Sequence, residues 1–177
     1  MKKMNKKKII VIVGNSGSGK TTISQDIAKQ CDFACLSEDQ FVFNMNPGSL
    51  IERKARKQDR EIGMQNLLSV LQNYLKNNKS VIIEGAFVDP PIYLQDLAKI
   101  AEKNNYIFIP IMLLVERKVS VKRKKKKPNG YIVPERIDAY LRQSANELGY
   151  QKICSVIDTS KVKYNDVVLK IKELIET

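Results

Sequence analysis

Near the start of the chain, glycine, serine, lysine and threonine follow one another at the spacing of a loop that binds phosphate. The segment from Gly14 to Thr21, GNSGSGKT, fits the pattern G-x-x-x-x-G-K-[ST]. Glycines at these positions let backbone N–H groups turn inward around an anion, because no Cβ stands in the way. We therefore predict a phosphate-binding loop made of Gly14, Asn15, Ser16, Gly17, Ser18, Gly19, Lys20, Thr21 and Thr22.

Lys20 and Thr21 supply the charge and the oxygen ligand of this loop. In this pattern the lysine spans the β- and γ-phosphates of a nucleotide, and the threonine hydroxyl ligates Mg²⁺. The alternative is a flexible glycine loop that fits the pattern by chance. However, an apolar run at Lys8 to Val13 precedes the loop, and a helix predicted from Lys20 to Gln30 follows it. This context favours nucleotide binding, with ATP and Mg²⁺ as the expected cofactors.

Two acidic residues follow the next two predicted strands. Asp39 comes after Phe33 to Ser37, and Glu84 comes after Val81 to Ile83. The carboxyl ends of parallel strands converge on the ligand crevice, where a carboxylate can orient a hydroxyl and accept its proton. Asp39 is our candidate for that role, with a simple turn cap as the alternative. Glu84 lies where an acidic residue would hold Mg²⁺ through water, and a purely structural role also stays open.

A basic stretch follows the fourth predicted strand, in a segment that we expect to form a lid over the site at residues 116–133. Its run VKRKKKK is most simply a solvated charged face. Its position argues for a second role, because cations are needed to balance charge on a phosphoryl group in transfer. Arg123 is the candidate for this cation.

The order of the elements predicts an α/β fold with a five-stranded, mostly parallel sheet between layers of helices. Short Val- and Ile-rich runs alternate with helical stretches along the chain. The remaining strands are expected at Tyr106 to Val115 and Ile153 to Asp158, and Pro110 predicts a bulge or a locally unpaired edge. Helices are expected from Ser49 past Leu75, from Pro90 to Lys103, from Glu116 to Lys127, from Pro134 to Gly149 and from Tyr164 to Glu176. The length of 177 residues predicts one domain spanning 1–177.

These motifs together resemble the P-loop kinases related to zeta toxins, polynucleotide kinase and chloramphenicol phosphotransferase. The resemblance rests on GNSGSGKTT, LSEDQF, VIIEGAF and VKRKKKKPNGYIVP, and it covers nearly the whole chain. It implies a three-layer kinase fold, Asp39 as the catalytic carboxylate and Glu84 beside the acceptor. It also implies a second lid cation, which is Lys127 by the polynucleotide-kinase spacing or Arg136 by the zeta-toxin spacing.

The sequence departs from this family at Val42, where polynucleotide kinase has an arginine that grips the phosphate of the acceptor. Arg53, Arg56 or Arg60 on the following helix could replace that arginine, although a solvated helix face is the simpler interpretation. This departure argues against the acceptors that zeta toxins and polynucleotide kinase phosphorylate.

Composition limits the remaining possibilities. The net charge is +12, but eleven of the 31 basic residues lie in Lys2 to Lys8 and Lys122 to Lys127, and the rest nearly balance the 19 acidic residues. The chain has no histidine, and the spacing of its three cysteines is not that of a metal site, so we expect core thiols. No apolar run reaches membrane-spanning length and no signal peptide is evident, which predicts a cytoplasmic protein without a membrane partner.

Three functions compete on this evidence. The favoured one is an ATP-dependent kinase that transfers the γ-phosphoryl group to a hydroxyl of a small molecule, such as a nucleoside, nucleotide or nucleotide sugar. The second is a polynucleotide 5′-hydroxyl kinase, which the basic runs favour and Val42 disfavours. The third is a nucleotide-binding module without transfer, which the presence of Lys20, Thr21 and Asp39 disfavours. Nucleic acid is therefore an open but not a favoured partner.

Overall fold

The chain folds around a five-stranded parallel sheet. The computed structural model describes residues 6–43, 57–85, 92–125 and 150–177. The strands are β1 (Lys8–Gly14), β2 (Ala34–Ser37), β3 (Val81–Gly85), β4 (Ile107–Leu114) and β5 (Ser155–Asp158). Their spatial order is β2-β3-β1-β4-β5, and each neighbouring pair is parallel. The predicted α/β class is confirmed, and the sheet is parallel throughout.

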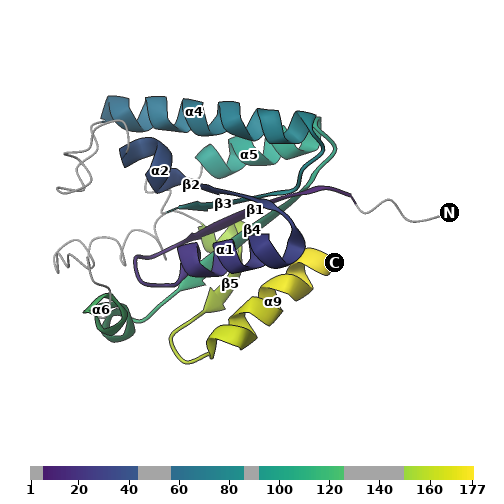
Figure 1. Ribbon diagram of the computed structural model, residues 1–177. Coiled ribbons are helices and arrows are strands. Elements are labelled where there is room, and N and C mark those ends of the chain that lie inside the picture. The colour runs from purple at the N-terminus through teal and green to yellow at the C-terminus, as the bar shows by residue number, and fades with distance from the viewer. Residues whose placement is uncertain (1–5, 44–56, 86–91, 126–149) are drawn as a thin grey trace.

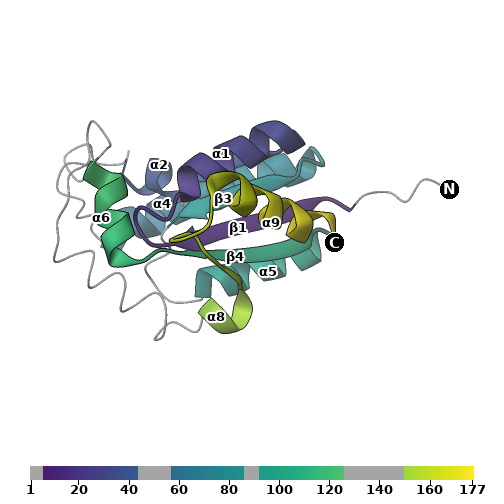
Figure 2. The same ribbon diagram turned by 90° about the horizontal axis from the view of Figure 1, so that it is seen from below.

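Helices cover both faces of the sheet and produce the three layers visible in Figure 1. One face carries α2 (Glu38–Phe43), α4 (Lys57–Lys76) and α5 (Ile92–Lys103), and the other carries α1 (Lys20–Cys31) and α9 (Tyr164–Glu176). Figure 2 shows α6 (Arg117–Lys125) at one end of the sheet and the short α8 (Tyr150–Ile153) before β5. None of the helices in the described part of the chain has the length and apolar composition needed to cross a membrane.

The central strand β1 joins two hydrophobic cores because its side chains alternate between the faces of the sheet. Ile9, Val11 and Val13 pack with the leucines of α4 and α5, whereas Ile10 and Ile12 pack with the apolar residues of α1 and α9. Every residue of β1 is buried. Full burial of one large apolar side chain contributes about 1.5–3 kcal/mol, so both layers hold this strand firmly.

Two local features differ from the expectations drawn from sequence. Helix α2, which was not expected, begins at Glu38, directly after Ser37. The fifth strand begins at Ser155 and not at Ile153, because Tyr150–Ile153 form α8. Pro110 causes no bulge, since β1 and β4 pair without interruption from Lys8↔Ile107 to Gly14↔Leu113. It lies instead where β4 is locally unpaired on its other side, because pairing with β5 starts only at Ile111. The helix expected from Pro134 to Gly149, and the starts of two others at Ser49 and Pro90, lie outside the described residues.

Candidate functional site

The predicted phosphate loop connects β1 to α1 and has the backbone that its glycines allow. Gly14, Gly17 and Gly19 have φ angles of 149°, 84° and 98°, which residues other than glycine rarely adopt. A Cβ on Gly14 would lie 2.2 Å from the Leu113 carbonyl oxygen in the neighbouring strand. The first glycine of the motif is therefore required by packing against β4 as well as by the turn of the loop.

Lys20 lies at the first position of α1 and folds back over the loop. Its ammonium donates to the carbonyl oxygens of Gly14 at 2.7 Å and Asn15 at 3.2 Å. The charge is thereby held at the mouth of the loop. This is the place from which a lysine of this motif reaches the outer phosphates of a nucleotide.

The Thr21 hydroxyl and the Glu84 carboxylate meet beside the loop. Thr21 Oγ1 lies 3.3 Å from each Glu84 carboxylate oxygen, and Ser37 donates a hydrogen bond to Glu84 Oε1 at 2.6 Å. The sheet produces this arrangement, since Glu84 on β3 is in register with Ile12 of β1 and Ser37 of β2. Only 4% of Glu84 is exposed. The hydroxyl groups of Thr21 and Ser37 therefore stabilise this buried carboxylate, as would a cation bound at the site.

Asp39 lies in the first turn of α2, two residues after Ser37, and its side chain is exposed. The helix rests on α4 at Gly63, where an added Cβ would come within 2.8 Å of the Phe41 carbonyl oxygen and 2.9 Å of Val42 Cα. Backbone thus packs on backbone, and this contact sets the position of α2. Val42, at the position where the resemblance to polynucleotide kinase predicts an arginine, is only 3% exposed and packs inward.

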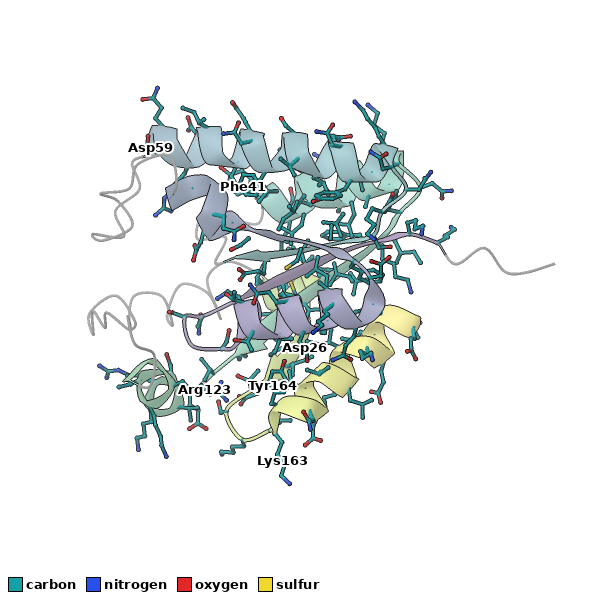
Figure 3. The ribbon with its side chains drawn as sticks, in the orientation of Figure 1. Asp26, Phe41, Asp59, Arg123, Lys163 and Tyr164 are labelled. Carbon is teal, nitrogen blue, oxygen red and sulfur yellow. The ribbon has the colours of Figure 1, made fainter. Side chains whose placement is uncertain are left out.

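Arg123 approaches the loop from α6. Its guanidinium donates to the Gly17 carbonyl oxygen at 3.1 Å, the Thr159 hydroxyl at 3.1 Å and the Thr159 carbonyl oxygen at 2.6 Å. Figure 3 shows it between α6 and the start of α9. A pocket of about 210 Å³ opens next to it, lined by Ser18, Gly19, Thr22, Ile23, Arg123, Thr159, Val162, Tyr164 and Val167.

Tyr164, which lines this pocket, lies next to Asp26 of α1 (Figure 3). The Tyr164 hydroxyl donates to Asp26 Oδ2 at 2.8 Å. Burial and this carboxylate raise the pKa of Tyr164 to about 12. Hydrogen bonds from Gln30 and Tyr164 lower the pKa of Asp26, so the tyrosine stays a donor and the carboxylate stays charged near neutral pH. The hydrogen bond therefore fixes the phenol that lines the pocket.

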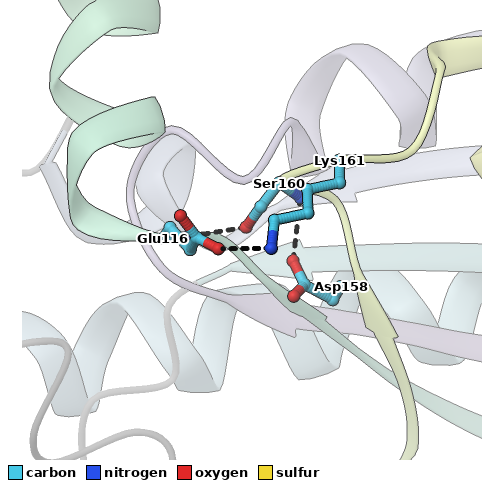
Figure 4. A network of polar contacts seen from close by, with 4 residues as sticks. All are labelled: Glu116, Asp158, Ser160 and Lys161. Atoms are coloured by element: carbon cyan, nitrogen blue, oxygen red, sulfur yellow. Dashed lines mark hydrogen bonds and ion pairs between the residues drawn. The ribbon is translucent and has the colours of Figure 1, made fainter.

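A polar network secures the loop between β5 and α9 (Figure 4). The Ser160 N–H donates to Asp158 Oδ1 at 2.8 Å, and the Glu116 N–H donates to Ser160 Oγ at 2.7 Å. Lys161 Nζ lies 3.6 Å from Glu116 Oε1. The hydrogen bonds from Ser160 are the main cause that lowers the pKa of Asp158. This network ties the residues around Thr159 to the end of β4.

The residues present fit a nucleotide and a magnesium ion. The loop glycines leave room for an anion, and the buried Ser18 hydroxyl, 1% exposed, has no hydrogen-bond partner among the described residues. Thr21 and Glu84 offer oxygen atoms, the ligand type that Mg²⁺ prefers, at the edge of the loop. Phosphate and metal could therefore be held side by side.

Most of the candidate residues drawn from sequence meet at this edge of the sheet. The loop residues Gly14 to Thr22, Glu84 and Arg123 lie together, Asp39 follows on α2, and Lys127 and Arg136 lie outside the described residues. Sequence reasoning missed Ser37, Ser120, Thr159 and Tyr164. The one signal available was that Ser37 is the last residue of β2 and Glu84 the last but one of β3. Nothing in the sequence connected residues near position 160 to the loop.

A phosphate loop between β1 and α1 of a parallel sheet defines the P-loop class of nucleotide-binding domains. The chain belongs to the AAA domain family, whose model matches residues 9–147. No curated protein matches the chain. The more specific resemblance to zeta toxins and polynucleotide kinase stays a prediction.

Solved structures share this fold at low sequence identity. A sugar kinase from Janibacter sp. HTCC2649 has a TM-score of 0.73 and 17% identity, over 96% of this chain and 95% of that one. A gluconokinase from Sinorhizobium meliloti 1021 has a TM-score of 0.65 and 16% identity, over 96% and 91%. The shikimate kinase from Acinetobacter baumannii, in complex with shikimate, has a TM-score of 0.61 and 20% identity, over 97% and 94%. The chain thus has the fold of these small-molecule kinases.

Proposed function

We propose that this protein is an ATP-dependent kinase that transfers the γ-phosphoryl group to a hydroxyl of a small molecule. The observation that carries the proposal is the meeting of Thr21 and Glu84 at the mouth of a complete phosphate loop. The sugar kinase, the gluconokinase and the shikimate kinase that share the fold support a small hydroxyl compound as acceptor. Within this group of acceptors, we include nucleosides, nucleotides and nucleotide sugars.

The loop and its neighbours have separate roles in binding ATP. Backbone N–H groups of the loop hold the β-phosphate, and Lys20 moves from the carbonyls of Gly14 and Asn15 to the outer phosphates. Thr21 and Glu84 would hold Mg²⁺, the glutamate through water. The ion, when bound, neutralises charge that develops on the phosphates. The pocket beside Arg123 and Tyr164 has the position and size to accept the base of the nucleotide.

Asp39 serves as the general base in this proposal. The acceptor hydroxyl gives its proton to the Asp39 carboxylate, and the hydroxyl oxygen forms a bond to the γ-phosphorus. The bond between that phosphorus and the β,γ-bridging oxygen breaks, and ADP leaves. The exposed position of Asp39 at the start of α2, next to the Ser37–Glu84 contact, supports this role. Arg123 and the lid cations Lys127 or Arg136 would balance the transferred charge.

A transfer screen with labelled ATP tests the proposal. Monosaccharides, sugar acids, shikimate, nucleosides, nucleotide sugars and antibiotics with free hydroxyls are offered singly, together with 5′-hydroxyl oligonucleotides. We expect one small-molecule class to be phosphorylated, and the Lys20→Ala variant to lose this activity while its melting temperature stays close to that of the wild type. Transfer at an equal rate by Lys20→Ala would refute the assignment.

Two other results would replace this function with a different one. The exposed Arg117, Lys118 and Lys122 on α6 favour an oligonucleotide acceptor as the second candidate. Phosphorylation of the oligonucleotide alone, with binding that weakens steeply as salt rises, would establish that candidate. ATP binding without transfer to any acceptor would indicate a nucleotide-binding module.

A further inference from the structure

The carbonyl oxygens of the phosphate loop are held, one after another, by side-chain donors. Lys20 binds those of Gly14 and Asn15. The next three carbonyls accept hydrogen bonds from residues far away in the sequence: Ser120 to Ser16 at 2.7 Å, Arg123 to Gly17 at 3.1 Å and Thr159 to Ser18 at 3.2 Å. Five consecutive carbonyls of the loop thus have a side-chain donor.

The donors for the last three carbonyls come from two elements that lie against the loop. Ser120 and Arg123 are three residues apart and therefore share one face of α6. The contact is close, because a Cβ on Gly17 would lie 2.8 Å from Ser120 Oγ and 3.2 Å from Ser120 Cα. Thr159 follows β5 directly. Ser120 is 0% exposed and Thr159 is 2% exposed, so water cannot replace either donor.

Thr159 connects the two sides of this arrangement. Its hydroxyl shares one hydrogen between the carbonyl oxygens of Ser18 at 3.2 Å and Leu114 at 2.9 Å, and accepts a hydrogen bond from Arg123. Its backbone N–H donates to the Leu114 carbonyl oxygen at 2.8 Å. Thr159 therefore links the ends of β4 and β5 to α6 and to the phosphate loop.

We propose that Ser120 and Thr159, together with Arg123, form a collar that fixes the phosphate loop in its anion-binding shape. In a trans peptide unit the N–H points away from the carbonyl oxygen, so a carbonyl bonded on the outer side turns the N–H of the next residue toward the inside, where a phosphate is bound. This applies to the units held by Ser120 and Thr159. In the unit held by Arg123, the Ser18 N–H donates to the Asn15 carbonyl oxygen at 3.1 Å. Ser120 and Thr159 are positioning residues, which act on the nucleotide only through the loop. The inference rests on the proposed nucleotide binding but does not depend on which acceptor is used.

Loss of a collar hydroxyl should destabilise the nucleotide-bound protein more than the free protein. Without its donor, the free loop can rotate the carbonyl toward another partner, whereas the loop around a phosphate cannot. A buried acceptor left without a partner costs enough to weaken ATP binding roughly 5- to 100-fold. Adenosine has no phosphates, so its binding should not change when the lost hydroxyl lies outside the base pocket, as that of Ser120 does.

The experiment measures binding of ATP, tripolyphosphate and adenosine by titration calorimetry for matched variants. Ser120→Ala and Thr159→Val, which keeps the side-chain shape, should both weaken the binding of ATP and tripolyphosphate. Adenosine binding should stay unchanged in Ser120→Ala, because Ser120, unlike Thr159, does not line the pocket proposed for the base. Thr159→Ser keeps the hydroxyl and should restore binding. Ser24→Ala is the control, because Ser24 is also 0% exposed and its hydroxyl has no partner among the described residues.

The outcomes separate this inference from the proposed function. If the wild type binds ATP and both Ser120→Ala and Thr159→Val bind it equally well, the collar does not position the loop. An equal loss of ATP and adenosine affinity in Ser120→Ala would refute it too, since that pattern indicates general damage to the pocket. If the wild type binds neither ATP nor tripolyphosphate, the proposed function itself fails.

Discussion

Thr21 and Glu84 are 63 positions apart in the chain, and the Thr21 hydroxyl lies 3.3 Å from both oxygens of the Glu84 carboxylate. The contact exists because β1 and β3 are neighbours in the sheet and the loop after β1 turns back over the end of β3. A hydroxyl and a buried carboxylate at this distance can supply two of the oxygen ligands of the proposed Mg²⁺ site. The relationship therefore predicts which substitutions should alter metal dependence.

Glu84→Gln should weaken the response to Mg²⁺ while the fold is kept. The amide keeps the size of the side chain but removes the charge that attracts the cation. Loss of a group that orients or holds a metal typically costs about 10–100-fold in affinity or activity. Titration of Mg²⁺ against the transfer rate and against ATP affinity checks this, with Glu102→Gln on the exposed face of α5 as the control. An unchanged Mg²⁺ requirement would assign Glu84 to the acceptor or to structure.

Asp39→Asn should slow transfer by about 10²–10⁴-fold, the usual contribution of a general base. ATP affinity should stay the same, because the phosphates are held by the loop and not by α2. Single-turnover transfer and nucleotide titration measure the two quantities separately. Glu38→Gln, at the preceding position of the same helix, is the comparison. A variant at position 39 that also loses ATP would point to a metal-binding role.

Gly63→Ala tests how α2 is positioned. In a free helix, alanine is favoured over glycine by about 1 kcal/mol. Here the added methyl group would lie 2.8 Å from the Phe41 carbonyl oxygen, so we expect net destabilisation of about 1–3 kcal/mol by overpacking. The displaced α2 should also lower kcat without changing ATP affinity, and urea unfolding together with transfer rates checks both effects. Ser69→Ala on the exposed side of α4 is the control, and a more stable Gly63→Ala protein would contradict the contact.

Local sequence patterns were sufficient for the loop, the five strands and α9, because each is encoded by residues next to one another. The motif from Gly14 to Thr21 specifies its own turn, and the apolar runs specify buried strands. Helix α2 was not predicted, although Glu38 and Asp39 are acidic residues of the kind that favours the first turn of a helix. The partners of the loop at Ser120 and Thr159 were out of reach, since only the tertiary fold brings β5 and α6 to it.

The thiol of Cys35 should report the charge on Glu84. Burial, and secondarily the Glu84 carboxylate, raise the pKa of Cys35 to about 11, and burial alone raises the pKa of Cys154 to about 11. The thiolate is the reactive form, so at pH 8 both thiols should react roughly 100-fold more slowly than an ordinary thiol of pKa about 8.5. Their rates should rise as the pH rises toward 11.

Alkylation by iodoacetamide, followed by mass spectrometry, provides the measurement and its internal control. Glu84→Gln should speed labelling of Cys35 and leave Cys154 unchanged, because only Cys35 senses that carboxylate. Fast labelling of Cys35 in the folded wild type, or equal acceleration at both cysteines, would contradict the described environment of β2.

The burial of β1 determines where the phosphate loop can open. All seven residues of β1 are buried, and the strand is hydrogen-bonded to a neighbour on each side. Amides in such a strand exchange with solvent deuterium only when the whole domain opens. The phosphate loop thus starts from the most protected part of the chain. A local opening that exposes the loop must therefore begin where α6 and Thr159 contact it. The hydrogen bonds there come from side chains.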